Sequence, residues 1–216
     1  VSTLMFAMLK PGDHVVLTAD CYRRTRQLVT SFLARFGIEH TTAEPSNLDA
    51  LEAAMRPQTR LIVAEAPTNP YLRVVDVEGL AKIRAKHQRA KLVVDSTLGT
   101  PINFRPLELG ADLVLHSCSK YLGGHNDLLS GAICGSQPLI DALRDARGLF
   151  GGMPDPHGAY LLIRGLKTLA VRMRQHNSNG ETVARFLARH PRIERVYYPG
   201  LETDPDHQVA RRQFSG

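Results

Sequence analysis

The chain has 216 residues, of which 43% are hydrophobic and 22% are charged, and it contains 17 glycines, 13 prolines, three cysteines and no tryptophan. This is the composition of an ordinary globular protein, and it excludes disordered, collagen-like and disulfide-scaffold classes. The net charge is +6 at pH 7. The basic residues are spread along the chain without an aromatic platform, so a non-catalytic, nucleic-acid-binding domain is only a remote alternative.

The predicted elements alternate between short β-branched strands and helices. Strands are predicted at residues 14–18, 38–42, 60–65, 91–95, 112–116 and 131–134. Helical periodicity is present between several of them, at residues 22–36, 48–55, 77–88 and 138–147. Alternation of this kind predicts an α/β domain with a mostly parallel sheet covered by helices.

The character of the sequence changes after Gly152. Residues 156–184 are predicted to be helical with a break near Gly165, and a short apolar segment follows at residues 196–198. We therefore expect a large domain over residues 1–177 and the beginning of a small α/β domain over residues 178–216. Neither end of the chain has a boundary signal, so we expect a piece of a longer protein that is truncated at both ends.

Membrane and metal signals are weak in this sequence. No apolar run approaches the ~20 residues that a membrane-spanning helix needs. The three cysteines show no Cys-x-x-Cys spacing, and the nine histidines form no pair with metal-ligand spacing. Since these patterns favour neither a disulfide framework nor a metal site, we expect a cytoplasmic protein without a bound metal or a membrane partner.

Polar residues directly follow four of the predicted strands. Asp20 and Tyr22 follow the first strand, residues 68–70 follow the third, Asp95 ends the fourth, and residues 116–120 follow the fifth. Ligands of open α/β sheets bind beyond the carboxyl ends of the strands. We therefore expect these residues to gather at one edge of the sheet and to form a site there.

Lys120 and Asp95 carry the chemistry of this predicted site. A lysine at a strand end, near buried surface, loses its proton more readily than a surface lysine, as attack on an aldehyde requires. A carboxylate that ends an apolar strand favours a cationic partner such as a pyridinium nitrogen, and their attraction is about 4 kcal/mol at ~4 Å and an effective dielectric near 20. Taken alone, each residue has a simpler interpretation: a solvated lysine beside a loop, and an aspartate that caps a turn.

Several segments resemble the Cys/Met-metabolism family of pyridoxal phosphate (PLP) enzymes. The resemblance covers essentially the whole chain, and the lysine segment is its most specific part. The segments that carry it are Ala66–Pro70, Lys91–Pro101, His116–His125 and Arg164–Leu169. Three further segments are most similar to the cystathionine γ-synthase branch of the family, namely Asp20–Arg26, Gly124–Gly131 and Val196–Leu201.

The resemblance implies the PLP-dependent transferase fold of the aspartate aminotransferase type (fold type I), and it implies roles for individual residues. Lys120 would hold PLP covalently through its amine and would then move protons as a catalytic residue. Asp95 would pair with the pyridine nitrogen of the cofactor. Tyr22 would stack on the cofactor ring and take part in catalysis, and Asn69 would bind the ring hydroxyl.

The phosphate group of the cofactor would be bound by Ser117 and Ser119, where Ser119 replaces the threonine that is usual in the family. Other parts of the family's site would lie outside this sequence. A Ser-Gly-Met turn that helps to bind the phosphate would come just before Val1, and the arginine that binds the substrate carboxylate would come after Gly216.

The resemblance also implies an activity: γ-replacement that joins L-cysteine to an activated homoserine ester and gives cystathionine. The alternatives within the family are a cystathionine or methionine γ-lyase and an O-acylhomoserine sulfhydrylase, and the motifs do not separate them. The family further implies a homotetramer built as a dimer of dimers, with amino-acid substrates as the only other partners.

Overall fold

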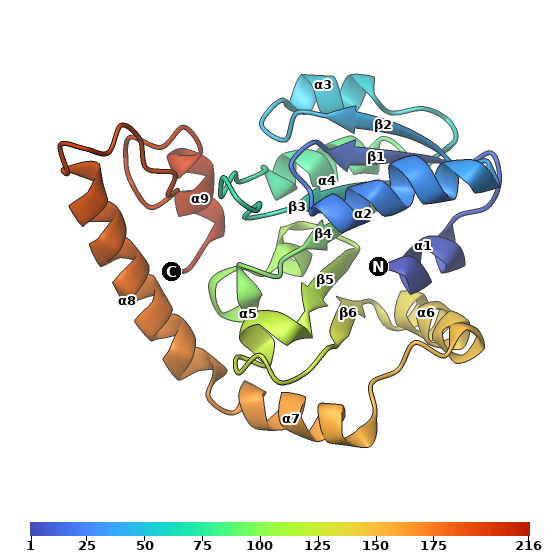
Figure 1. Ribbon diagram of the computed structural model, residues 1–216. Helices are drawn as coiled ribbons and strands as arrows, with labels where there is room; N and C mark the ends of the chain where they lie inside the picture. The colour runs from blue at the N-terminus through green and yellow to red at the C-terminus, as the bar shows by residue number, and fades with distance from the viewer.

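The computed structural model describes all 216 residues of the chain. Its centre is a six-stranded sheet with the strand order β2-β1-β3-β4-β5-β6 (Figure 1). Neighbouring strands are parallel except for β6, which runs antiparallel to β5. The strands are β1 (His14–Thr18), β2 (Glu39–Ala43), β3 (Thr59–Glu65), β4 (Lys91–Asp95), β5 (Leu113–Ser117) and β6 (Gly131–Gly135). Every predicted strand is therefore confirmed, with ends that agree within one residue.

Nine α-helices accompany the sheet: α1 (Ser2–Met8), α2 (Arg23–Gln27), α3 (Leu48–Ala53), α4 (Val77–Ala85), α5 (Thr100–Asn103), α6 (Gln137–Phe150), α7 (Pro156–Leu166), α8 (Leu169–Ala188) and α9 (His207–Gln213). The predicted helix at residues 22–36 is one helical stretch of changing geometry. In it, α2 continues as a π-helical turn, Leu28–Phe32, and a 3₁₀ turn, Leu33–Phe36. Two more short turns are the 3₁₀ turn Pro106–Leu109 and the π-helical turn Cys118–Leu122.

Local signals in the sequence set several helix ends. The side chains of Asn47, Asp76 and Asp155 accept hydrogen bonds from backbone amides in the first turns of α3, α4 and α7. Such caps satisfy amides that have no partner inside the helix. Gly151 ends α6 in the left-handed conformation at φ 71°, which glycine adopts without strain.

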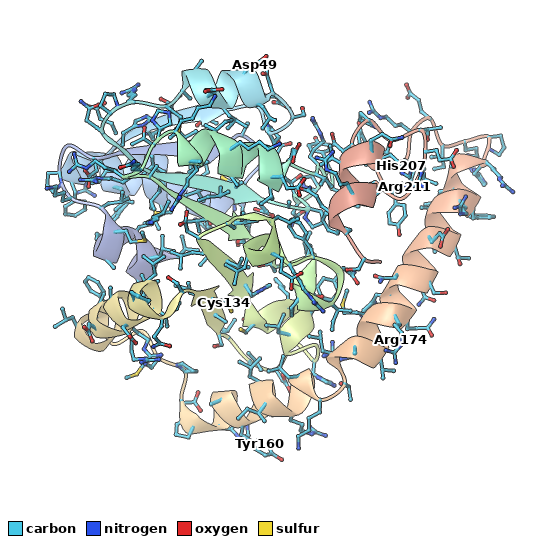
Figure 2. The ribbon with its side chains drawn as sticks, turned by 180° about the vertical axis from the view of Figure 1, so that it is seen from behind. Asp49, Cys134, Tyr160, Arg174, His207 and Arg211 are labelled. Atoms are coloured by element: carbon cyan, nitrogen blue, oxygen red, sulfur yellow. The ribbon has the colours of Figure 1, made fainter.

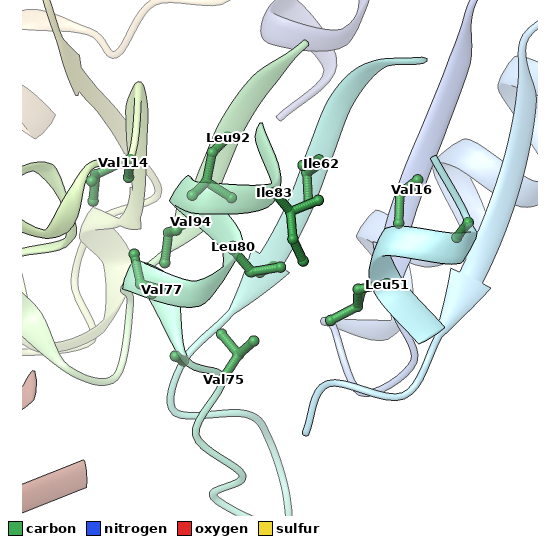
Figure 3. Packing of buried hydrophobic residues seen from close by; sticks show 14 of the residues in the cluster. Val16, Leu51, Ile62, Val75, Val77, Leu80, Ile83, Leu92, Val94 and Val114 are labelled. Carbon is green, nitrogen blue, oxygen red and sulfur yellow. The ribbon is translucent and has the colours of Figure 1, made fainter. Parts of the chain in front are cut away.

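Two hydrophobic cores cover the two faces of the sheet. Alternate strand residues such as Val16, Ile62 and Val94 pack with α3 and α4 on one face (Figure 3). Their neighbours along the strands, such as Val15 and Val63, pack on the other face with α1, the helical stretch after β1, and α6. Because successive strand side chains point to opposite faces, strands buried on both sides are apolar throughout, as these sequences are.

The chain leaves the sheet after α6 and forms an arm made of α7 and α8, which runs along one side of the body (Figures 1 and 2). The predicted break near Gly165 is confirmed, since α7 ends at Leu166 and α8 begins at Leu169. The apolar segment at residues 196–198 forms no strand. After α9 the chain returns to the body, where the rings of Phe104 and Phe214 stack with centroids 4.3 Å apart.

The expected domain boundary between residues 177 and 178 falls inside the unbroken helix α8, and the division into two domains stays a prediction. None of the helices combines the length and the apolar character that crossing a membrane requires.

Candidate active site

The sheet topology brings the predicted site residues to one edge. The strands β1, β3, β4 and β5 are adjacent and parallel, so their carboxyl ends lie side by side. Tyr22, Asn69, Asp95 and residues 117–120 follow or end these four strands. The expectation that polar residues gather at this edge is therefore confirmed.

Asp95 is held at the end of β4 by Thr97. The backbone amide and the hydroxyl of Thr97 both donate to Oδ1 of Asp95, at 3.0 and 2.5 Å. The Thr97 hydroxyl in turn accepts a hydrogen bond of 2.8 Å from the backbone amide of Ser117 at the end of β5. This chain of contacts fixes one carboxylate oxygen and leaves Oδ2 without a partner. The sequence analysis missed Thr97, although a hydroxyl two residues after a strand-end aspartate is a known turn signal.

A second carboxyl group, Glu65, lies beside Asp95. The two residues are register partners at the ends of β3 and β4, so their side chains lie on the same face of the sheet. Burial, and after it the charge of Asp95, raise the pKa of Glu65 to about 8. At neutral pH Glu65 is therefore mostly protonated. In the sequence analysis Glu65 was only the last residue of an apolar strand.

A cavity of about 690 Å³ opens at this edge. Tyr22, Asp95 and Ser117 line it, together with residues of β6 and α6. The volume lies within the range of small-molecule and cofactor sites. Of the other predicted site residues, Asn69, Ser119 and Lys120 lie outside this lining.

Lys120 lies in the π-helical turn that directly follows β5. Its own backbone is not helical (φ −90°, ψ −125°), and the turn is closed by a hydrogen bond of 2.7 Å from the amide of Gly124 to the carbonyl of Lys120. The side chain is exposed, and its amine forms neither an ion pair nor a hydrogen bond within the chain. The amine is thus available to a ligand.

The two predicted phosphate ligands differ in their surroundings. The hydroxyl of Ser117 forms no hydrogen bond within the chain, and the residue lines the cavity. The hydroxyl of Ser119 instead accepts a hydrogen bond of 3.1 Å from the backbone amide of Ser130. Ser117 therefore offers a free donor to an anion, whereas Ser119 also holds the start of the segment that leads into β6.

Three of the four buried side-chain polar atoms without a hydrogen-bond partner lie at the same edge. They are Thr18 Oγ1 at the end of β1, Ser96 Oγ directly after β4, and His116 Nδ1 near the end of β5. Burial also lowers the pKa of His116 and so favours its neutral form. Unpaired buried polar atoms cost about 1–3 kcal/mol each. Of the three residues, His116 lines the cavity, whereas Thr18 and Ser96 do not.

These residues fit PLP. The free oxygen of Asp95 suits a cationic ring nitrogen, the Ser117 hydroxyl suits a phosphate oxygen, and the free amine of Lys120 suits an aldehyde carbon. Tyr22 is 52% exposed and lines the cavity, so its ring has a face available for stacking.

A residue of the arm, Arg172, fastens the turn that contains Lys120. Its guanidinium donates to the carbonyl of Tyr121 at 2.7 Å and to the carbonyl of Gly165 at 2.8 Å. A Cβ at Gly124 would lie 2.3 Å from this guanidinium, and a Cβ at Gly165 would lie 2.2 Å from the carbonyl oxygen of Gly123. Glycine is therefore required where the arm meets the turn. Arg172 was not predicted, because its partner in this turn, the carbonyl of Tyr121, is 51 positions away along the chain.

No group of three or more His, Cys, Asp or Glu side chains in the 216 residues has the arrangement of a metal site. The three cysteines are free. Burial raises the pKa of Cys21 to about 12 and that of Cys118 to about 11, so both thiols are protonated at neutral pH.

The fold and this edge are typical of α/β enzymes that bind a cofactor at the carboxyl ends of parallel strands. The model of the Cys/Met metabolism PLP-dependent enzyme family matches residues 1–216. The chain belongs to this family, whose enzymes depend on PLP, and the expected fold class is thereby confirmed.

Relatives with different activities match the chain over nearly its whole length. Cystathionine gamma-synthase 1, chloroplastic, from Arabidopsis thaliana is 47% identical over 218 residues, which are 100% of this chain and 38% of that protein. L-methionine gamma-lyase from Fusobacterium nucleatum subsp. polymorphum is 43% identical, over 99% of this chain and 55% of that protein. The crystal structure of metB from Corynebacterium glutamicum has a TM-score of 0.96 at 42% identity and covers 99% of this chain and 56% of that one. The chain thus spans about half or less of the length of these relatives.

Proposed function

We propose that the full-length protein catalyses PLP-dependent γ-replacement, in which L-cysteine is joined to an activated homoserine ester to give cystathionine. The observation that carries this proposal is the placement of two residues at one sheet edge, at or after the ends of the neighbouring strands β4 and β5. Asp95 has one free carboxylate oxygen beside a cavity, and Lys120 has a free amine. The similarity to a cystathionine gamma-synthase over the whole chain supports the choice of reaction.

Each residue of the site would have its own role in this reaction. PLP, when bound, supplies a sink for the electrons left on the substrate after a proton is removed. Lys120 would anchor the cofactor through its amine and, once released, would remove and return protons at the substrate carbons. Asp95 would keep the ring nitrogen protonated, because an attraction of about 4 kcal/mol corresponds to roughly three pKa units.

The remaining residues would bind and orient. Tyr22 would cover one face of the cofactor ring and exclude water from it. Asn69 would donate to the ring hydroxyl, and Ser117 and Ser119 would donate to the phosphate. The family's enzymes act on amino acids, and we place cysteine and a homoserine ester among them as the substrates of this protein.

The second candidate is a γ-lyase, and the observation that favours it is the L-methionine gamma-lyase that is 43% identical over the same residues. An O-acylhomoserine sulfhydrylase is the third member of this set. A product assay distinguishes the three reactions. With a homoserine ester as the first substrate, cystathionine formed only when cysteine is added supports the synthase, and homocysteine formed with sulfide supports the sulfhydrylase. An oxoacid released from cystathionine or methionine, without a second substrate, supports the lyase.

The experiment that tests the cofactor and its anchor together is borohydride trapping. The full-length protein is incubated with PLP, reduced and digested, and the peptide that contains Lys120 is weighed. A phosphopyridoxyl group on this peptide is the expected result. Labelling of other lysines with none at Lys120 would disprove the assignment.

We also propose that the full-length protein assembles as a homotetramer in the cytoplasm. The family's enzymes are typically oligomeric, and α7 and α8 expose large apolar side chains such as Tyr160, Ile163 and Phe186. The free cysteines agree with a reducing compartment. Sedimentation of the purified protein measures its assembly, and cell fractionation measures its location.

A further inference from the structure

Glu65 is a buried carboxyl group that has no role in the proposed function. It ends β3, is only 6% exposed, and lies in register with Asp95 on β4. The charged groups that act on it are Asp95 and Asp20, which are both acidic, and no basic side chain is among them. A carboxyl group in such a place costs free energy unless hydrogen bonds satisfy it.

Two backbone amides from separate loops point to this carboxyl group. The amide of Tyr22 donates a hydrogen bond to Oε2 of Glu65. The amide of Asn69, four residues after Glu65, also acts on this carboxyl group and lowers its pKa. Tyr22 and Asn69 are the two residues that would contact the ring of the cofactor.

The amide of Tyr22 has no other partner. Tyr22 is the N-cap residue of α2, and its side chain makes no cap hydrogen bond. Its own amide comes before the helical hydrogen-bond pattern, so it needs an acceptor from elsewhere. Since the Tyr22 side chain is half exposed, packing alone does little to fix it. The carbonyl of Tyr22 accepts a hydrogen bond from the amide of Arg26 within α2, and the hydrogen bond to Glu65 is the contact that ties Tyr22 to the end of β3.

We propose that Glu65 is a positioning residue that holds Tyr22 and Asn69, through their backbone amides, at a fixed place around Asp95. This inference deepens the proposed function and rests on it for the link to the cofactor. Glu65 would touch neither cofactor nor substrate. It would act by joining two loops of the site, those after β1 and β3, at one buried point beside the end of β4.

The first test measures the two amides directly, without cofactor. Hydrogen exchange of the Tyr22, Asn69 and Val93 amides is compared by NMR in the full-length protein and its Glu65→Ala and Glu65→Gln variants. In Glu65→Ala we expect Tyr22 and Asn69 to exchange at least about tenfold faster, and Val93 in the centre of β4 to be unchanged. Glu65→Gln keeps one accepting oxygen, so at least one of the two amides should stay protected.

The matched control is Glu39→Ala. Glu39 is an exposed glutamate at the start of β2, at the other end of the sheet, where it pairs with Arg56 at 2.6 Å. This variant should leave all three exchange rates unchanged. Equal rates at Tyr22 and Asn69 in the parent and in Glu65→Ala would overturn the proposal. So would equal acceleration at Val93, because it would mean that the whole sheet had loosened.

The second test links the position of the loops to the cofactor. PLP is titrated into the same four proteins, and its binding is followed by fluorescence. Glu65→Ala should weaken PLP binding about tenfold, Glu65→Gln less, and Glu39→Ala not at all. Unchanged affinity in Glu65→Ala would break the link between Glu65 and the cofactor. If the parent protein itself takes up no PLP, the proposed function fails, and the exchange rates still decide whether Glu65 holds the two loops.

Discussion

Both ends of the central sheet bury polar residues, but most of these have hydrogen-bond partners at one end and several lack them at the other. At the amino ends of the strands, both ring nitrogens of His14 have hydroxyl partners, Thr59 at 2.8 Å and Thr41 at 2.9 Å. Asp112, just before β5, accepts from the guanidinium of Arg84 and from the amide of Leu92. The polar groups at this end mainly satisfy one another and stabilise the fold, with Arg84 Nε as the one buried atom left unpaired.

At the carboxyl ends the same kinds of groups are left incomplete. Thr18 and Ser96 bury hydroxyl oxygens that have no partner, and Glu65 and Asp95 place two carboxyl groups side by side without a cation. The polar groups at the amino ends of the strands thus contribute to stability, whereas those at the carboxyl ends remain available to bind a ligand. This difference predicts that equivalent substitutions at the two ends will have opposite consequences for activity and for stability.

The largest expected effect on activity is that of Lys120→Ala. Loss of the amine should reduce turnover to the background, because no other free lysine amine belongs to this edge. Urea unfolding should show a change in the free energy of unfolding within about 0.5 kcal/mol, since the side chain is exposed. Lys167→Ala removes an exposed lysine of the arm and should leave turnover unchanged. Residual turnover in Lys120→Ala above that background would refute the role of the lysine.

The same substitution at two aspartates tests the comparison most directly. Asp95→Asn should lower kcat/KM about 10²- to 10³-fold, because an amide does not hold a ring nitrogen protonated. Its free energy of unfolding without cofactor should stay the same or rise, since one charge beside Glu65 is removed. Asp112→Asn should lower the free energy of unfolding by about 1–3 kcal/mol and leave kcat/KM intact. Similar losses of activity in both variants would contradict the division between the two ends.

A pair of threonines offers a smaller test of the same kind. Thr59→Val removes the hydroxyl that His14 and the amide of Arg56 both use, and it should destabilise the fold by about 1–3 kcal/mol. Thr18→Val removes a buried hydroxyl without a partner and should be neutral or slightly stabilising in the cofactor-free protein. Thermal unfolding of the two variants side by side measures the difference, and equal losses would show that Thr18 has a partner after all.

The last effect, which is small within any one pH unit, concerns the pH dependence of stability. Burial, and after it the charge of Arg56, lower the pKa of His14 from 6.5 to about 4, so only the unfolded chain binds this proton between those values. Stability should therefore be lost as the pH falls from 6.5 to about 4. Glu65, with its pKa raised from 4.5 to about 8, stays protonated in the folded chain and should lower stability as the pH rises through that range. Each group contributes a slope of at most about 1.4 kcal/mol per pH unit.

Urea unfolding across pH 4 to 8 measures the sum of the two contributions, which oppose each other between pH 4.5 and 6.5, while only that of Glu65 remains above pH 6.5. In His14→Gln stability should fall from pH 4.5 to 8, and in Glu65→Gln it should fall only as the pH drops below 6.5. A stability that does not change between pH 6.5 and 8 in the parent chain would contradict the assignment to Glu65, and one that does not change below pH 6.5 in Glu65→Gln would contradict the assignment to His14.

Local patterns were enough to predict the strands and where they point. Runs such as 91–95 are continuously apolar, and this predicts strands buried on both faces, while the polar residues after them predict the edge where Tyr22, Asp95 and Lys120 come together. The antiparallel direction of β6 had no such signal, because an apolar run has the same pattern in either direction.

The residues that the sequence analysis missed all act through distant contacts. Glu65 reaches Tyr22, 43 positions away, and Arg172 reaches Tyr121, 51 positions away. Neither pairing leaves a periodicity or a short motif. Thr97 is close to Asp95, but its importance depends on a further hydrogen bond to Ser117 on another strand.

The close approach of α7 to the turn after Lys120 also limits how this chain can vary. The Cβ of any side chain at position 165 would lie 2.2 Å from the carbonyl oxygen of Gly123. The two backbone segments cannot move apart easily, because Arg172 forms hydrogen bonds to both of them. In a saturation library, position 165 should accept glycine alone. The exposed neighbours Arg164 and Leu166 should accept many amino acids. Among related sequences, a single invariant position between two variable ones would thus mark where the arm contacts the turn that contains Lys120.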